Sequence, residues 1–190
     1  MNIIMKLSGI IKSAVLVSLL FAYPTGLWAQ KYISYESKVS FFSEAPLENI
    51  EAVNSSASSI LNLENGEIVF SVPIRGFEFR KSLMQTHFNE NYMESEIYPK
   101  STFKGKVSGF RPEPGKYSAT AVGELAIHGV TRKVEITGNI EIGPNELTLL
   151  AKFPVKLEDH NIKIPKLLFS NIAETVEVTI EFNYRPYVTN

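Results

Sequence analysis

The chain of 190 residues contains no cysteine and only one aspartate, Asp159. Without cysteine it forms no disulfide, has no thiolate nucleophile and carries no lipobox. A Ser-His-Asp triad would have to use Asp159 or recruit a glutamate, and there is no G-x-S-x-G motif to display the serine. Glycine-rich phosphate loops are also missing. These absences predict a protein that is not an enzyme and that needs no cofactor.

Charge and histidine spacing argue against two further kinds of site. The formal net charge is -1, so the chain has no excess of basic residues to neutralise nucleic-acid phosphates. The three histidines, His87, His128 and His160, are too far apart for a short-spaced ligand set, although distant residues can converge in space. We therefore predict neither nucleic-acid binding nor a metal site.

The first 29 residues have the pattern of an export signal. Lys6 and Lys12 precede the apolar run 14–22, and the segment ends at the small residue Ala29, as a signal peptidase requires. The alternative is a retained membrane anchor, but the run is shorter than the ~20 residues that a span needs. We expect a periplasmic or secreted protein in which residues 30–190 form a single domain, with a net charge of -3 and no membrane span.

Short alternating runs separated by turn residues fill most of the remaining chain, which is typical of an all-β sandwich or barrel. Asn65-Gly66 is the clearest hairpin signal, because this pair tolerates the positive φ angles of a type I′ turn. The strands are expected within 32–43, a run ending near 63, 67–74, 101–110, 116–142, 146–155 and 175–184, and within 32–43 the residues in phase are Ile33, Tyr35, Val39 and Phe41.

One segment interrupts the β pattern. Ser82 and Gln85 have the spacing of a capping box, in which their side chains bond free backbone donors at the start of a helix. We expect a single short helix near residues 82–89 that plugs a barrel end or covers a sheet edge. Its apolar side would carry Leu83, Met84, His87 and Phe88.

Residues 116–142 alternate apolar and polar side chains and break at His128-Gly129, as in a long hairpin. One face carries the odd-numbered residues of 117–127 and the even-numbered residues of 134–142. This face is apolar at its ends and rich in Ala and Gly between them. Such a face fits a closed sheet with room for an apolar guest. Alternatively, the small residues only relieve crowding where the sheet bends or another element packs close.

The motifs of this chain resemble those of the YceI-like family of exported proteins. The resemblance is carried by LMQTHFNENYMESEIYPKSTFKGKV at 83–107 and by GELAIHGVTRKVEI at 123–136. The tail, 155–184, looks like the C-terminal portion of the family. The match is looser before Glu67 and at Asn161, where many relatives carry glycine.

The resemblance implies an antiparallel, lipocalin-like β-barrel of about eight strands, and some members hold a long polyisoprenoid chain in the interior. An interior of this kind would bind a lipid by excluding water from its hydrocarbon tail. Alternation along the strands places the following residues in that predicted ligand site: Phe41, Phe70, Phe103, Tyr117, Ala119, Ala121, Leu125, Ile136 and Phe153.

Three functional hypotheses follow. The leading one is an exported, non-enzymatic binding protein that holds an amphiphilic lipid, polyisoprenoid or quinone-like, in the barrel interior. The second is a periplasmic stress-response or interaction module whose barrel is filled by side chains and binds no lipid. The third is an enzyme that acts on a lipid head group through His128, His160 and Asp159. A hollow interior distinguishes the first hypothesis from the second.

Overall fold

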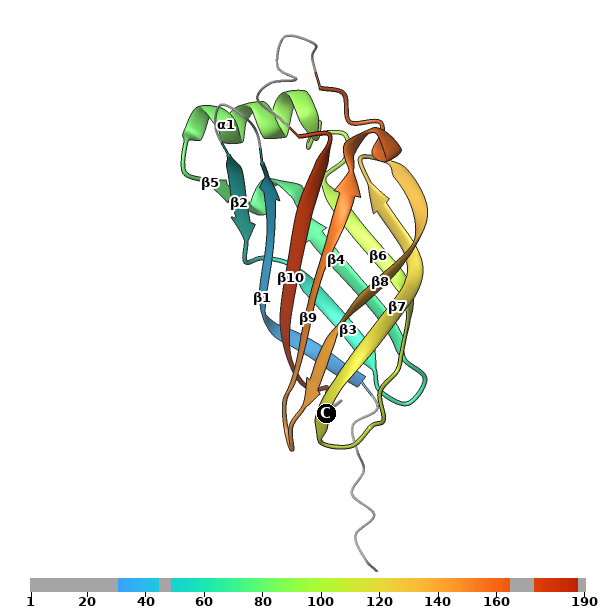
Figure 1. The fold of residues 1–190 in the computed structure, drawn as a ribbon. Helices are drawn as coiled ribbons and strands as arrows, with labels where there is room; N and C mark the ends of the chain where they lie inside the picture. Colours follow the sequence, from blue (N-terminus) through green and yellow to red (C-terminus); the bar gives the residue numbers. More distant parts are fainter. Residues whose placement is uncertain (1–30, 45–48, 165–172, 188–190) are drawn as a thin grey trace, which may run out of the picture.

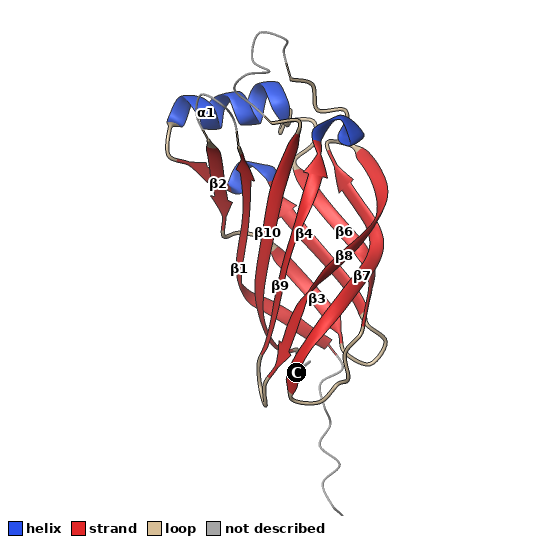
Figure 2. Ribbon diagram, in the orientation of Figure 1, coloured by secondary structure: helices blue, strands red, loops and turns tan. Residues whose placement is uncertain are grey.

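The strands of the protein form one antiparallel sheet that closes on itself (Figures 1 and 2). The structure is a computed structural model that describes residues 31–44, 49–164 and 173–187, so the predicted export signal lies outside the described residues. The elements are β1 (Lys31–Ser43), β2 (Ile50–Asn54), β3 (Ser58–Asn62), β4 (Glu67–Pro73), η1 (Ile74–Gly76), β5 (Phe77–Phe79), α1 (Ser82–His87), η2 (Phe88–Tyr92), β6 (Lys100–Ser108), β7 (Gly115–Ile127), β8 (Val130–Ile142), β9 (Leu147–Lys156), η3 (Leu157–His160) and β10 (Thr175–Pro186).

Eight of these strands, in the order β10-β9-β8-β7-β6-β4-β3-β1, form the barrel, which confirms the predicted fold class with its one short α-helix. β1 closes the barrel by pairing with β10, from Tyr32 opposite Pro186 to Phe42 opposite Glu177. On its other edge β1 pairs first with β3 and then with β2, so the sheet forks there. β2 in turn pairs with β5, and this branch lies at the end of the barrel that carries α1 (Figure 1).

The longest hairpin of the barrel is the one that the alternation predicts. β7 and β8 pair over 13 residues each, from Gly115 opposite Ile142 to Ile127 opposite Val130. His128 and Gly129 both have positive φ, 50° and 73°, as a two-residue type I′ turn requires. The sequence break at this pair is therefore the turn itself.

Two glycines on the inner face of this region make room for an aromatic ring. Gly105 of β6 lies opposite Gly123 of β7. A Cβ atom on either glycine would lie 2.7 or 2.8 Å from Cζ of Phe103, a clash that glycine avoids. The Phe103 ring therefore covers the glycine pair, as aromatic side chains often do in sheets. At this point the small residues relieve crowding, as the alternative interpretation of the sequence proposed.

Two local expectations are wrong. A bulge between Ser34 and Glu36 shifts the alternation of β1, so that Tyr32 is buried and Tyr35 is 51% exposed. Asn65-Gly66 belongs to a four-residue connection between β3 and β4, in which only Gly66 has positive φ. The Gly66 amide donates to the Asn62 carbonyl at 2.9 Å, so the hairpin is present but its turn is not type I′.

The helix begins where the sequence places it, but for a different reason. Lys81 is the N-cap residue, and its carbonyl accepts the amides of Met84 and Gln85 at 3.1 and 3.2 Å, with no side-chain cap. Gln85 instead accepts the Phe79 amide through Oε1 at 3.4 Å, which joins the helix to β5. The predicted capping box is therefore wrong. None of the helices in the described part of the chain has the length and hydropathy of a membrane span.

Buried aromatic residues fill the middle of the barrel. Phe70 stacks on Phe103 with ring centroids 5.1 Å apart and lies 5.9 Å from Phe182. The fully buried Tyr184 donates its hydroxyl hydrogen to Ser59 at 2.7 Å, and burial raises the pKa of the Tyr184 phenol far above its usual range. The barrel thus has a packed aromatic layer in which the phenol of Tyr184 is hydrogen-bonded.

Asn54 holds the fork of the sheet together. Its side chain is completely buried, Nδ2 donates to the Pro73 carbonyl at 2.7 Å, and Oδ1 accepts the amide and hydroxyl of Ser56 at 2.8 and 2.9 Å. These bonds tie the end of β2 to the end of β4, whose strands do not pair with each other.

We expect Asn54→Ala to lower the free energy of unfolding by about 1–3 kcal/mol, because it leaves buried backbone groups without partners. Asn139→Ala is the matched control, since Asn139 is exposed on β8, and it should change stability by no more than about 0.5 kcal/mol. Urea unfolding followed by circular dichroism measures both values. Equal stabilities of the two variants would show that the Asn54 bonds do not stabilise the fork.

Candidate functional site

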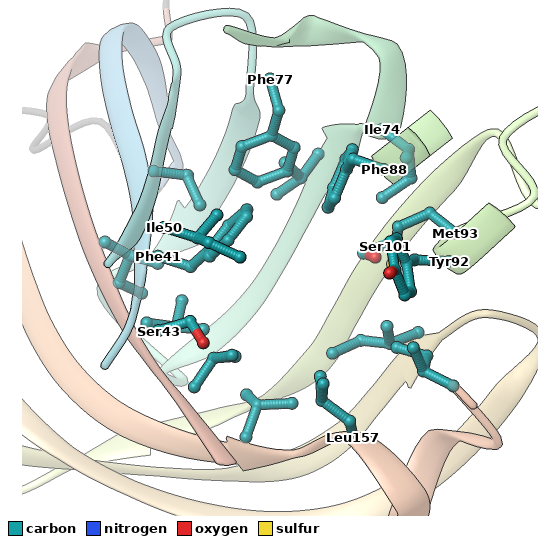
Figure 3. A pocket seen from close by; sticks show the side chains of 18 of the residues that line it. Phe41, Ser43, Ile50, Ile74, Phe77, Phe88, Tyr92, Met93, Ser101 and Leu157 are labelled. Carbon is teal, nitrogen blue, oxygen red and sulfur yellow. The ribbon is translucent and has the colours of Figure 1, made fainter. Parts of the chain in front are cut away.

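A cavity of about 160 Å³ lies inside the end of the barrel that carries α1 (Figure 3). It is more than ten times the roughly 10–15 Å³ that a cavity needs to hold one water molecule. The residues that line it come from the barrel strands, from the β2–β5 branch, from the helical segment and from the region of η3. They are Val39, Phe41, Ser43, Ile50, Phe70, Val72, Ile74, Phe77, Phe79, Met84, Phe88, Tyr92, Met93, Ser101, Leu125, Ile127, Phe153, Val155, Leu157, Ile162, Val176, Val178 and Ile180.

Residues 82–93, which we call the cover segment, form one wall of this cavity. Met84, Phe88 and Tyr92 are spaced four residues apart, so they lie on one side of the helical segment and face the barrel, and Met93 adds a buried side chain. Leu83 is 66% exposed and His87 is exposed, so the predicted apolar side of the helix is narrower than expected. The cover segment was missed as part of the ligand site, although its i, i+4 spacing is visible in the sequence.

An aromatic cluster attaches the cover segment to the barrel and to the β2–β5 branch. The ring of Phe88 lies 5.5 Å from Phe41, 5.5 Å from Phe77 and 5.0 Å from Phe79, measured between centroids. Aromatic pairs at these separations contribute about 0.5–1.5 kcal/mol each beyond the area that they bury. Phe88 is therefore the main apolar anchor of the segment.

A second cavity, of about 30 Å³, lies deeper in the barrel. Phe70 and Ile180 line both cavities, so their side chains form the boundary between them. The deeper cavity borders Ala119, Ala121 and Gly138, where the hairpin lacks large side chains. The interior is thus hollow at the α1 end and nearly filled beyond the aromatic layer.

The nine residues of the predicted ligand site divide between these two spaces. Phe41, Phe70, Leu125 and Phe153 line the larger cavity. Phe103, Ala119, Ala121 and Ile136 line the smaller one with Phe70. Tyr117 is not among the lining residues of either space, and its hydroxyl donates to the Glu113 carbonyl at 3.0 Å. The structure brings four of the nine together in the larger space, and ligand contact by all nine stays a prediction.

Hydroxyl groups are the polar side-chain groups in the lining of the larger cavity, on Ser43, Tyr92 and Ser101. Ser43 is buried, and its oxygen accepts the Ala173 amide at 3.0 Å. Burial raises the pKa of the Tyr92 phenol, which therefore stays neutral at physiological pH. The cavity is an apolar space with a small number of neutral polar groups.

A hydrogen-bonded cluster at the rim of the larger cavity holds residues 94–98, which follow the cover segment. Nδ1 of His128 lies 3.1 Å from the His160 carbonyl, which can only accept, so this nitrogen carries a hydrogen. Nε2 of the same ring lies 2.8 Å from Oε2 of Glu94, and the Tyr98 ring lies 4.5 Å from the imidazole between centroids. The cluster ties residues 94–98 to the β7–β8 turn and to η3.

His160 is also engaged with the backbone. Its Nδ1 donates to the Val130 carbonyl at 3.1 Å, and burial lowers the pKa of its imidazole. Arg132 donates through Nε to the Asp159 carbonyl at 2.8 Å. Within the described residues, no three His, Cys, Asp or Glu side chains form a group that could hold a metal ion. His128, His160 and Asp159 thus lie together at the rim, where the bonds named here serve the fold.

The depressed pKa of His160 predicts a pH-dependent stability. The folded state binds a proton on the His160 imidazole less tightly than the unfolded state does. The stability that His160 contributes is therefore fully present above the unfolded pKa of about 6.5 and is lost as the pH falls through the lower folded pKa. Urea unfolding of the wild type should therefore show a larger loss of stability between pH 7.5 and 5.5 than that of His160→Gln. The same loss in both proteins would contradict this role of His160.

The comparisons with known proteins agree with this architecture. A family model described as YceI-like domain matches residues 34–184. Similar solved structures include a polyisoprenoid-binding domain from Saccharophagus degradans, with TM-score 0.72, 14% identity and coverage of 82% of this chain and 98% of that one. BcnA from Burkholderia cenocepacia has TM-score 0.66 and 18% identity, with coverages of 77% and 95%. The Campylobacter jejuni YceI protein has TM-score 0.56 and 14% identity, with coverages of 70% and 81%. No curated protein sequence matches the chain.

Proposed function

Because this chain belongs to the YceI-like family, we propose that it is an exported, non-enzymatic binding protein that holds an amphiphilic lipid, polyisoprenoid or quinone-like, in its barrel. The observation that carries the proposal is the 160 Å³ cavity, whose lining is almost entirely apolar. The neighbour described as a polyisoprenoid-binding domain supports the class of ligand.

The energetics of such binding follow from the lining. Each CH₂ group that leaves water for an apolar space contributes about 0.8 kcal/mol, and no directional contact is required. Binding of this type discriminates poorly between chains that differ by one methylene, by about 1–3 kcal/mol at most. The proposed protein is therefore selective for hydrocarbon character more than for one molecule.

The size of the cavity limits what enters without a change of shape. A cavity of about 150 Å³ is filled by a molecule the size of benzene, which is close to one isoprene unit. A longer chain requires the cover segment to move away from the barrel or the boundary residues Phe70 and Ile180 to rotate. The cover segment is suited to this movement, because Phe88, Tyr92 and Met93 attach it through apolar contacts and the bond from the Phe79 amide to Gln85 is long, at 3.4 Å.

Export and location in the periplasm or outside the cell are part of the proposal. They rest on the basic start, the apolar run 14–22 and the small residue at Ala29. The absence of turnover is also proposed. It is supported by the rim cluster, in which both ring nitrogens of His128 and Nδ1 of His160 already face partners.

The second hypothesis, an interaction or stress-response module with a packed barrel, has one observation in its favour. The stacked pair Phe70 and Phe103, with Phe182 beside it, fills the middle of the barrel, and the space beyond it is only about 30 Å³. If Phe70 cannot move, the interior shelters little of a long chain. Native mass spectrometry of the gently purified protein, alone and with added isoprenoid, distinguishes the two functions: a bound lipid supports the carrier, and a protein that stays empty supports the module.

A pair of valines on β4 tests whether the cavity is the binding space. Val72 lines the cavity and is 4% exposed, whereas Val69 on the same strand is 46% exposed on the outer face. Val72→Phe should reduce the affinity for geraniol at least about tenfold, because the added ring fills the space, and Val69→Phe should leave it unchanged. Displacement of a neutral fluorescent dye measures binding, and melting temperature verifies that both variants fold. Equal affinities in two folded variants would place the ligand elsewhere.

A further inference from the structure

The lining of the larger cavity points to the chemical class of the ligand's polar end. This inference rests on the proposed function and refines it. We propose that the ligand has an uncharged, hydrogen-bonding head group, of the alcohol or carbonyl type, and that the hydroxyls of Tyr92 and Ser101 bind that group inside the barrel. An isoprenoid diphosphate or a fatty acid anion would then not be the preferred ligand.

The lining of the larger cavity is almost entirely apolar. Of the 23 residues around the cavity, 20 have apolar side chains, and the other three carry hydroxyls. Among the described residues that line it there is no Asp, Glu, Lys, Arg or His. A charged group moved from water into such a space loses its hydration without gaining an opposite charge, and this cost is far greater than for a neutral group. The lining therefore selects against ionic head groups.

The hydroxyl-bearing side chains of the lining come from different elements of the fold. Tyr92 comes from η2 and Ser101 from β6, both line the cavity, and their side chains appear in the same part of the view in Figure 3. Ser43 lies on another part of the wall in the same view, and its oxygen already accepts the Ala173 amide. Tyr92 and Ser101 are thus the two hydroxyl-bearing residues of the lining that share one part of this view, apart from Ser43.

The hydroxyls of Tyr92 and Ser101 can bond either a carbonyl or an alcohol oxygen. Each supplies one donor and two acceptor lone pairs, so together they can donate to a carbonyl oxygen or both donate to and accept from an alcohol. A phenol with its usual pKa of about 10 keeps its hydrogen at neutral pH, and burial raises the pKa of Tyr92 further, so its hydroxyl can donate. Two charged side chains at the rim have other partners: Glu94 contacts His128, and Arg132 donates to the Asp159 carbonyl. A neutral oxygen is the group that this wall accommodates.

The opposite side of the cavity suits the hydrocarbon tail. Phe41, Phe77 and Phe79 pack together there, and the labelled Phe41, Ile50 and Phe77 lie across the cavity from Tyr92 and Ser101 in Figure 3. A bound isoprenoid would place its oxygen at the hydroxyl pair and its methyl-bearing chain against the rings. Tyr92 and Ser101 would thereby set the direction of the ligand in a space whose other lining residues, apart from Ser43, are apolar.

The test compares three ligands with the same 15-carbon chain: farnesol, farnesene and farnesyl diphosphate. Affinities are measured on the wild-type protein by displacement of N-phenyl-1-naphthylamine, a neutral dye. We expect farnesol to bind about tenfold more tightly than farnesene, since it gains hydrogen bonds to the pair. We expect farnesyl diphosphate to bind at least ~100-fold more weakly than farnesol, because its charges must stay in water or lose their hydration.

Two substitutions locate the head group. Tyr92→Phe combined with Ser101→Ala removes both hydroxyls and keeps the ring, and it should lower the affinity for farnesol about tenfold while leaving that for farnesene unchanged. Tyr35→Phe is the control, because Tyr35 is 51% exposed, and it should change neither affinity. Melting temperatures verify that the variants fold.

Each outcome decides a separate point. If farnesyl diphosphate binds as tightly as farnesol, the inference of an uncharged head group is overturned while the proposed lipid binding stands. If the double variant binds farnesol as the wild type does, Tyr92 and Ser101 are not the head-group site. If none of the three ligands displaces the dye or binds in native mass spectrometry, the proposed function itself fails.

Discussion

Closure of the sheet by β1 and β10 is the constraint on which the rest of this structure depends. Once ten registered residue pairs join these strands, the eight-stranded barrel has a fixed width, and that width leaves space for side chains or for one small guest. What fills the interior is then decided by individual residues. The aromatic layer around Phe70 and Phe103 fills the middle, and the α1 end, which the helical segment covers, remains hollow.

The cover segment links this architecture to the proposed binding. It supplies one wall of the cavity through Met84, Phe88 and Tyr92, and its end is held at the rim by the contact between Glu94 and His128. The segment itself is thus attached mainly by apolar packing, and the residue that follows it, Glu94, is held by a polar cluster. Such a division would let the segment move to admit the proposed ligand while the rim keeps its position.

Much of the fold is predictable from the sequence, because alternation and turn residues act locally. The β7–β8 hairpin, its turn at His128-Gly129 and the inward faces of β9 and β10 follow from these rules. The β2–β5 branch and the place of the cavity do not, since they depend on where distant elements meet. The glycine at position 123 illustrates the difference: its small size is visible in the sequence, but the ring of Phe103 that occupies the space is not.

A crystal of the protein equilibrated with xenon under pressure would test most directly whether the α1 end of the barrel encloses a dry apolar space. Xenon occupies empty apolar cavities and does not replace well-bonded water. We expect xenon density within the 160 Å³ cavity. Ordered water in the cavity, or lining side chains packed together with no density between them, would contradict the hollow interior from which the proposed binding follows.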